Sequence, residues 1–170
     1  PADNHGLLLA ALASGDPVVY MEHKELWGTP GAVTSGDVVP LGKARIAREG
    51  RDVTIVSWSR QVQTCLDAAG QLAAQGVQAE VIDLRTIWPW DKAAVLQSVA
   101  TTGRLLVVHE AIRVAGFGAE IAATVAEETD AHVARLGAPR IPVGYAATLE
   151  AEARVTAAQI AAAAHKLGAP

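Results

Sequence analysis

The sequence predicts an α/β fold, namely a three-layer α/β/α sandwich in which helices cover both faces of a mostly parallel sheet. Short β-branched apolar runs, such as Val53–Trp58 and Gln78–Leu84, alternate with segments that carry apolar residues at helical spacing. Hydrophobic residues make up 51% of the 170 residues, yet the chain has only one Phe and one Met. Small apolar side chains let helices pack closely on a sheet, so these observations favour βαβ units over an aromatic-rich sandwich.

Residues 1–41 precede the alternating pattern and divide into two parts. Residues 1–24 hold a predicted helix, Asn4–Ala13, and a predicted short strand, Val18–Met21. One short helix and one strand cannot bury a core alone, so we interpret residues 1–24 as the tail of a preceding domain. Residues 25–41 are rich in Gly, Pro, Ser and Thr without an apolar period, which predicts a linker or surface arm.

The main body, residues 42–170, is predicted to form one α/β domain. The expected strands, in chain order, are Lys43–Arg48 at an edge, Val53–Trp58, Gln78–Leu84, Leu105–Val108 and His132–Leu136. The expected helices are Gln61–Ala74, one capped by Asp91, Glu120–Val125 and a closing helix, Thr148–Lys166.

Arg104–Val125 is the stretch around which we expect this body to be organised. It reads as a buried strand, a loop with Gly116 and Gly118, and a helix. His109 and Glu110 end the apolar run, where we expect the strand to meet solvent. Ligands of parallel sheets bind beyond the carboxyl ends of strands, so this loop is the first place to look for a site.

His109 and Glu110 are candidates for an acid/base pair or for half of a metal site. Adjacent residues on a strand point to opposite faces, so the two side chains cannot easily converge on one proton or ion. We therefore favour a hydrogen-bonded pair at a strand end over a catalytic one. Gly116-Phe117-Gly118 resembles part of a dinucleotide-binding fingerprint, but the spacing is incomplete and glycines for a tight turn are the preferred interpretation.

Other polar and aromatic residues have simpler interpretations. Asp83 and Arg85 are predicted to form an ion pair at a strand terminus, and Cys65 to be a small core residue of a helix. Ser57 and Ser59 lack the context of an activated nucleophile. In Trp88-Pro89-Trp90 we expect two indoles that cover the sheet end rather than an exposed recognition patch.

Charge and composition exclude several classes of function. The formal net charge of −4 leaves no basic footprint, so we expect no nucleic-acid partner. No apolar run approaches the roughly 18 residues of a membrane span, so we expect no membrane partner. The single cysteine fits a reducing compartment. The chain starts at Pro1 rather than Met, and we expect the numbering to begin inside a longer gene product.

Six segments, spread in the same order over nearly the whole chain, resemble the β subunit of 2-oxo acid dehydrogenase E1 components. These enzymes are the thiamine-diphosphate decarboxylases of the branched-chain 2-oxo acid, pyruvate and acetoin complexes. The segments are GDPVVYMEHKELW, VVPLGKARIAREGRDVTIVSW, QAEVIDLRTIWPWD, TGRLLVVHEA, GFGAEIAATV and IPVGYA. The sequences of Glu80–Ile87 and Pro89–Asp91 are most similar to those of branched-chain members, which we slightly favour over pyruvate members.

The resemblance implies that residues 42–170 are a transketolase C-terminal-like domain and residues 1–24 the end of the pyrimidine-binding domain. It implies an oxidoreductase that decarboxylates a 2-oxo acid and transfers the acyl group to lipoyl-E2. In that family, thiamine diphosphate and its Mg²⁺ lie between the α subunit and the N-terminal part of the β subunit. We therefore expect no catalytic or cofactor-binding residue here, and the isolated chain to be inactive.

The family's C-terminal domain contacts the E1 α subunit and the second β subunit, and it docks the subunit-binding domain of E2. The acidic residues Glu127, Glu128 and Asp130 are reasonable contacts for that often basic module, although such a cluster can also be merely solvated. Branched-chain members hold a structural potassium ion, and the matching positions are the Ala11 carbonyl, Ser14 and Asp16. Ser14 stands where a carboxylate is common and half of the site is missing, so we expect no ordered potassium in this chain alone.

Two other functions remain open at the level of the sequence. The first alternative to an E1 β subunit is a non-catalytic interaction module made as its own polypeptide, and the second is a piece of a transketolase or 1-deoxyxylulose-phosphate synthase. The resemblance favours a cytoplasmic location, or the mitochondrial matrix in a eukaryote.

Overall fold

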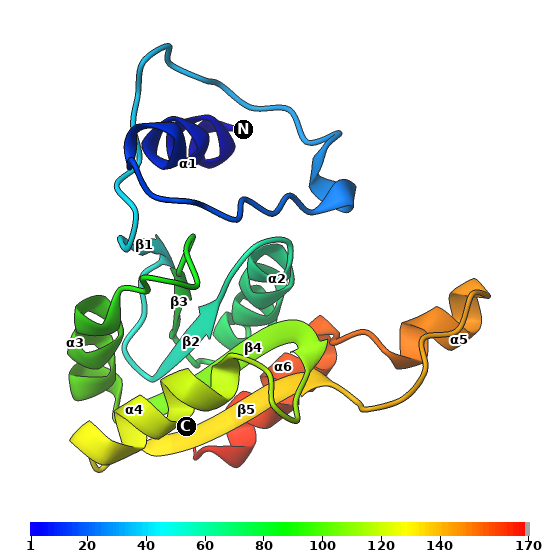
Figure 1. Cartoon of the computed structure of the whole chain (residues 1–170). Helices are drawn as coiled ribbons and strands as arrows, with labels where there is room; N and C mark the ends of the chain where they lie inside the picture. The colour runs from blue at the N-terminus through cyan, green and yellow to red at the C-terminus, as the bar shows by residue number, and fades with distance from the viewer. Residues whose placement is uncertain (169–170) are drawn as a thin grey trace.

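The computed structural model describes residues 1–168 and contains the expected α/β architecture, with a sheet between two layers of helices (Figure 1). The five strands follow the order β1-β3-β2-β4-β5, and only β1 runs antiparallel to its neighbour, β3. Their bounds are β1 Arg45–Arg48, β2 Val53–Ser57, β3 Ala79–Asp83, β4 Arg104–Ile112 and β5 His132–Ala138. The prediction of a three-layer, mostly parallel α/β fold is confirmed.

Both faces of the central strands are buried, which explains their continuous apolar runs. Every residue of β2 and β3 is buried. Alternate side chains pack into two cores: Ile55 and Leu106 lie on one face of the sheet, Val56 and Val107 on the other. Neither face could remain uncovered in water, so each needs a layer of helices.

Two helices cover each face of the sheet (Figure 1). Helices α2 (Gln61–Ala73) and α6 (Ala157–Lys166) share the first core through residues such as Leu72 and Ile160. Helices α3 (Lys92–Thr102) and α4 (Gly118–Glu128) share the second core. Asp91 caps α3 as predicted, because its Oδ1 accepts a hydrogen bond from the Ala94 amide at 3.2 Å.

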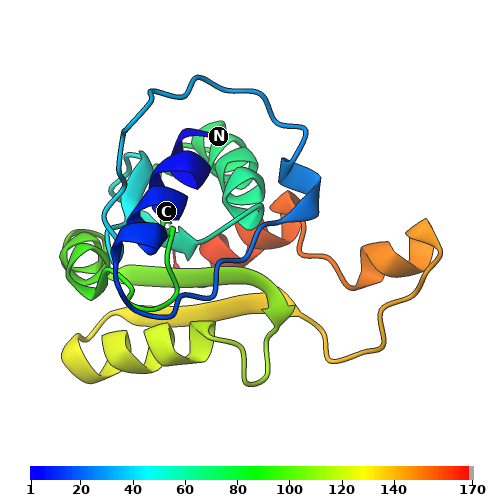
Figure 2. The same ribbon diagram turned by 45° about the horizontal axis from the view of Figure 1, so that its top comes forward.

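The N-terminal arm, residues 1–41, contains α1 (Ala2–Ala13) and one 3₁₀ turn, η1 (Lys24–Leu26). They lie on opposite sides of an open loop in both views (Figures 1 and 2). The predicted strand at residues 18–21 is wrong, because this segment has no strand structure and Val19 is 84% exposed. Its apolar side chains fit a strand, but no strand of the described sheet lies beside it to complete the hydrogen bonds.

The closing helix predicted at residues 148–166 is also wrong, because it is two helices. Helix α5 (Ala147–Glu152) ends at Ala153 and projects from the body (Figures 1 and 2). Val155 turns into the first core, and Thr156 then starts α6 with a reciprocal capping box with Gln159. The Ala-rich composition suggested one helix, but the buried valine and the cap interrupt it.

Within residues 1–168, no helix combines the length and the apolar character required to cross a bilayer.

Candidate functional site

The sheet has a topological switch point between β2 and β4. From β2 the chain crosses to β3 on one side, and then returns to β4 on the other side. The connections therefore diverge at the carboxyl ends of β2 and β4, where open α/β sheets commonly bind ligands. Arg60 and Gln61 follow β2, and Glu110 lies near the end of β4.

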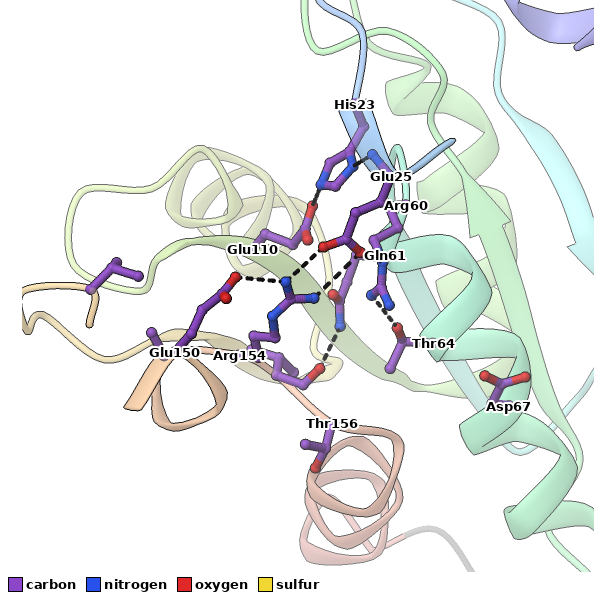
Figure 3. Close-up of a pocket in the computed structure, with 13 residues that line it drawn as sticks. His23, Glu25, Arg60, Gln61, Thr64, Asp67, Glu110, Glu150, Arg154 and Thr156 are labelled. Carbon is purple, nitrogen blue, oxygen red and sulfur yellow. Dashed lines mark hydrogen bonds and ion pairs between the residues drawn. The ribbon is translucent and has the colours of Figure 1, made fainter. Parts of the chain in front are cut away.

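A cavity of about 500 Å³ opens at this place. Its walls come from four parts of the chain: the arm, the start of α2, β4 and the segment from residue 143 to 156 (Figure 3). The volume lies within the range of pockets that hold small molecules. The lining residues that carry charge are His23, Glu25, Arg60, Asp67, Glu110, Glu150 and Arg154.

Glu25 of the arm lies between two arginines from distant parts of the chain (Figure 3). Arg154 Nη2 is 2.6 Å from Glu25 Oε1 and Arg154 Nη1 is 3.3 Å from Oε2, so this pair is bidentate. Arg60 Nε approaches the same Oε2 to 2.5 Å. The hydrogen bond from Arg154 is the main reason why the pKa of Glu25 lies below its ordinary value.

A histidine attaches the arm to β4 beside this triad. His23 Nδ1 accepts a hydrogen bond from the Glu25 amide at 3.2 Å, and its Nε2 lies 3.2 Å from Glu110 Oε2. Since Nδ1 accepts, Nε2 carries the proton and donates to the carboxylate. A neutral His23 therefore satisfies both contacts.

Glu110 and His109 do not form an acid/base pair, as their opposite directions on the strand predict. Glu110 contacts the arm, whereas His109 is fully buried and stacks on Trp58 with ring centroids 5.4 Å apart. His109 Nδ1 donates to the Ala111 carbonyl at 2.9 Å, and Nε2 has no hydrogen-bond partner in the described structure. The expectation that the strand meets solvent at His109 is wrong, because β4 continues to Ile112.

Burial lowers the pKa of His109 below its ordinary value, although the Ala111 hydrogen bond opposes this. The imidazole is therefore neutral near pH 7, and it forms part of the core rather than of a site that is open to solvent.

Three glycines make room for the His109 ring. A Cβ on Gly118 would lie 2.6 Å from His109 Cδ2 and Nε2, and on Gly116 or Gly137 it would lie 2.7 or 2.8 Å from Cε1. A Cβ on Gly116 would also lie 2.5 Å from the Ile112 carbonyl oxygen, which agrees with the interpretation of glycines for a tight turn. Positive φ occurs at Ala115, not at Gly116 or Gly118, so the turn needs these glycines for close approach rather than for backbone freedom.

The predicted Asp83–Arg85 ion pair is wrong. Asp83 Oδ2 pairs with Arg45 at 3.2 Å, and the Arg85 guanidinium pairs with Asp3 of α1 at 2.9 Å. Only the Arg85 amide donates to Asp83 Oδ1, at 3.1 Å. Burial raises the pKa of Asp83 above its ordinary value against these hydrogen bonds.

Of the remaining candidates, Cys65 is buried as predicted, and burial raises the pKa of its thiol to about 12. The interpretation of the tryptophan pair is only half right. Trp90 packs against the second core, but Trp88 is 80% exposed.

The three candidate potassium ligands lie together in the turn after α1. Ser14 Oγ donates to the Ala11 carbonyl at 2.9 Å and accepts from the Asp16 amide at 3.3 Å. The Ala11 carbonyl is thus already used within the turn. The three candidate E2 contacts, Glu127, Glu128 and Asp130, lie exposed at the end of α4, and Glu128 forms an ion pair with Lys92.

Sequence reasoning did not find the Glu25, Arg60 and Arg154 triad. Glu25 stood in a predicted linker, and the pairing of Glu25 with Arg154 spans 129 positions. Nothing in local spacing signals such a contact. The placement of Arg60 directly after a central strand was the one available signal.

Residues 42–160 match the family described as transketolase, C-terminal domain. The chain belongs to that family. The solved structure of a split-gene transketolase, an inactive β4 tetramer, superimposes with a TM-score of 0.73 at 27% identity, and the match covers 82% of this chain and 47% of that one. The predicted transketolase C-terminal-like fold is therefore confirmed.

Members with curated names are similar over most of this chain. The β subunit of acetoin:2,6-dichlorophenolindophenol oxidoreductase from Cupriavidus necator is 43% identical over 171 residues, covering 98% of this chain and 51% of the relative. Mitochondrial pyruvate dehydrogenase E1 subunit beta-1 of Arabidopsis thaliana is 45% identical over 87% of this chain and 43% of its own. Mitochondrial 2-oxoisovalerate dehydrogenase subunit beta of Chaetomium thermophilum is 50% identical over 82% and 30%.

These relatives bear out the resemblance to E1 β subunits of the branched-chain, pyruvate and acetoin type. The chain spans about half the length of the relative from Cupriavidus necator, and less of the other two.

Proposed function

We propose that this transketolase C-terminal domain is the C-terminal part of the β subunit of a thiamine-diphosphate-dependent 2-oxo acid dehydrogenase, an oxidoreductase. The main support is the similarity of 98% of the chain to an acetoin-oxidising β subunit, together with the similarities to pyruvate and 2-oxoisovalerate dehydrogenases. The role of the segment is assembly with an α subunit and a second β subunit, and docking of E2.

Thiamine diphosphate supplies the electron sink for decarboxylation in this proposal. Residues 1–168 contain no group of three His, Cys, Asp or Glu side chains placed to hold a metal ion. From the resemblance to the family, we propose that the cofactor and its Mg²⁺ bind outside the described residues. This chain's own residues would then act on the reaction only through assembly.

The test is turnover by a reconstituted pair of the full-length β subunit and its α partner, with the cofactor and Mg²⁺. Release of CO₂ is measured with pyruvate and with 3-methyl-2-oxobutanoate, and we expect decarboxylation of at least one of the two, with the branched substrate slightly favoured; cleavage of acetoin, which has no carboxyl group to lose, is measured separately. The 170-residue chain in place of the full β subunit should give none. If no substrate is turned over by the full-length pair, the proposal fails.

Transketolase is the second candidate, because the split-gene transketolase has the same fold as this chain. Ketol transfer between sugar phosphates by the same full-length pair, without 2-oxo acid decarboxylation, would favour it. An isolated interaction module is the third, and it predicts neither activity.

For E2 docking, we propose Glu127, Glu128 and Asp130 as contacts of a basic subunit-binding domain. All three are exposed, two of them form no ion pair within residues 1–168, and Glu128 would exchange Lys92 for the partner. Added salt should weaken the binding of E2 by the intact complex, and so should Glu127→Gln with Asp130→Asn, whereas the exposed Glu120→Gln on the same helix serves as control. Salt-insensitive binding would exclude these contacts.

For potassium, we propose that Ala11, Ser14 and Asp16 form half of a site completed by residues outside this chain. Oxygen atoms of all three residues lie in one turn, which suits a hard cation. Thermal stability of the full-length subunit should be higher in KCl than in NaCl, and equal stability would count against the half-site.

The location we propose is the cytoplasm, or the mitochondrial matrix for a eukaryotic protein.

A further inference from the structure

We infer that Arg60 and Arg154 form a binding site for a small oxyanion at the switch-point cleft, and that the arm residue Glu25 occupies this site from within the chain. A carboxylate or phosphate ion that enters the cleft displaces Glu25 and frees the turn η1 from the two arginines. This inference concerns the cleft alone and is independent of the proposed enzyme function.

The convergence of two guanidinium groups is the first argument. Arg60 follows β2 and Arg154 follows α5, and both reach the same carboxylate of Glu25. Planar guanidinium groups match the geometry of carboxylate and phosphate oxygens, so what binds Glu25 here also binds a free oxyanion. Without an anion between them, the two positive groups would face each other across the cleft.

The weak attachment of the internal ligand is the second argument. Glu25 lies in η1, which has no buried residue, and the neighbouring Trp27 is 66% exposed. Apart from the two arginine contacts, the described structure has one other polar contact between this turn and the domain, which joins His23 to Glu110. Solvent-exposed ion pairs contribute about 0–1 kcal/mol each, so exchange of Glu25 for another anion is feasible.

The lining of the cleft limits which anions fit. Gln61 is buried and donates to the Val155 carbonyl at 3.2 Å, which fixes the floor beside the arginines. Glu110, Glu150 and Asp67 face the same cavity, and Glu150 remains paired with Arg154 at 2.7 Å. These carboxylates repel extended polyanions. A small ion that carries one carboxylate or phosphate group fits the two arginines best.

The test is isothermal titration calorimetry of the 170-residue chain with acetate and, separately, with inorganic phosphate, at constant ionic strength set with chloride. Glu25→Gln keeps the shape of the side chain but removes the competing charge. We expect Glu25→Gln to bind at least one of the two ions about tenfold more tightly than the unaltered chain does, since the tethered competitor is gone. The ion that Glu25→Gln binds more tightly shows whether the site prefers a carboxylate or a phosphate group.

Two further variants separate a site from a charge effect. Glu25→Gln with Arg154→Gln should lose the gain, and Glu120→Gln, an exposed glutamate on α4, should bind as the unaltered chain does. In the unaltered chain, an ion that binds should change the fluorescence of Trp27, and Trp27→Phe should abolish that change. Far-ultraviolet circular dichroism confirms that each variant is folded, and Arg60→Gln replaces Arg154→Gln if that variant is not.

The inference is overturned if Glu25→Gln binds neither ion more tightly than the unaltered chain. It is equally overturned if the double variant retains the gain, or if Glu120→Gln produces the same gain. Decarboxylase activity enters none of these measurements, so their failure leaves the proposed enzyme function untouched.

Discussion

At the scale of single residues, the ring of His109 determines which residues the neighbouring loops can carry. Gly118→Ala would place a methyl group 2.6 Å from His109 Cδ2 and Nε2, within a core that cannot move freely. We expect this substitution to lower the free energy of unfolding by about 1–3 kcal/mol, because overpacking displaces the ring. Unfolding in urea, followed by circular dichroism, measures the change.

Gly70→Ala is the matched control, since it adds the same methyl group where, among residues 1–168, no heavy atom beyond the neighbouring backbone of its own helix lies within 4 Å. Gly70 lies inside α2 at an exposed position, so alanine should stabilise the chain by roughly 0.5–1 kcal/mol. A loss at both positions would mean that the ring is not the cause.

His109 also makes stability depend on pH. Its folded pKa lies below the ordinary value of 6.5, so the unfolded chain binds a proton more readily than the folded chain does. This difference destabilises the fold as pH falls through 6.5, by up to about 1.4 kcal/mol per pH unit, and it vanishes above that value. Asp83, whose pKa is raised, acts in the opposite direction at a lower pH.

Urea unfolding between pH 5 and pH 8 measures this dependence. His109→Gln should flatten the slope below pH 6.5, whereas His132→Gln, at an exposed position, should leave the slope in place. An unchanged slope in His109→Gln would assign the pH dependence to other groups.

At the scale of secondary structure, the break between α5 and α6 depends on one cap. Thr156 accepts from the Gln159 amide at 3.3 Å, and the Gln159 side chain accepts from the Thr156 amide at 2.9 Å. Thr156→Ala should cost about 1 kcal/mol, because the Gln159 amide at the helix start loses its partner, the Thr156 hydroxyl. Thr101→Ala, inside α3 and exposed, should change stability by less than about 0.5 kcal/mol. Thermal unfolding distinguishes the two, and equal effects would contradict a capping role.

The elements that the sequence predicted correctly are those whose pattern is decided locally. β2 and β3 are continuous apolar runs between polar turns, and Asp91 is a cap beside its own helix. The strand expected at residues 18–21 was wrong because its pattern can only form a strand next to a partner strand. The cleft was missed for the same reason, since Glu25 and Arg154 meet only after the chain has folded.

At the scale of the whole molecule, large apolar side chains lie exposed on the arm and around α5. The sequence suggested this for Leu26 and Trp27, and both are exposed. Further large apolar side chains in these two regions, each more than half exposed, are Val19, Met21, Val38, Val143, Tyr145 and Leu149, together with Leu12 of α1. Exposed apolar surface of this kind favours association.

We therefore expect the 170-residue chain to self-associate in a concentration-dependent way, which sedimentation velocity measures. Tyr145→Ser with Leu149→Ser removes two exposed apolar groups at α5 and just before it, and should shift the population toward the monomer. Ala123→Ser, exposed on α4, changes polarity outside these regions and should have no effect. If the unaltered chain is monomeric at all concentrations, polar neighbours shield these side chains and the exposed apolar surface does not drive assembly. If both variants dissociate it equally, association depends on general polarity rather than on α5.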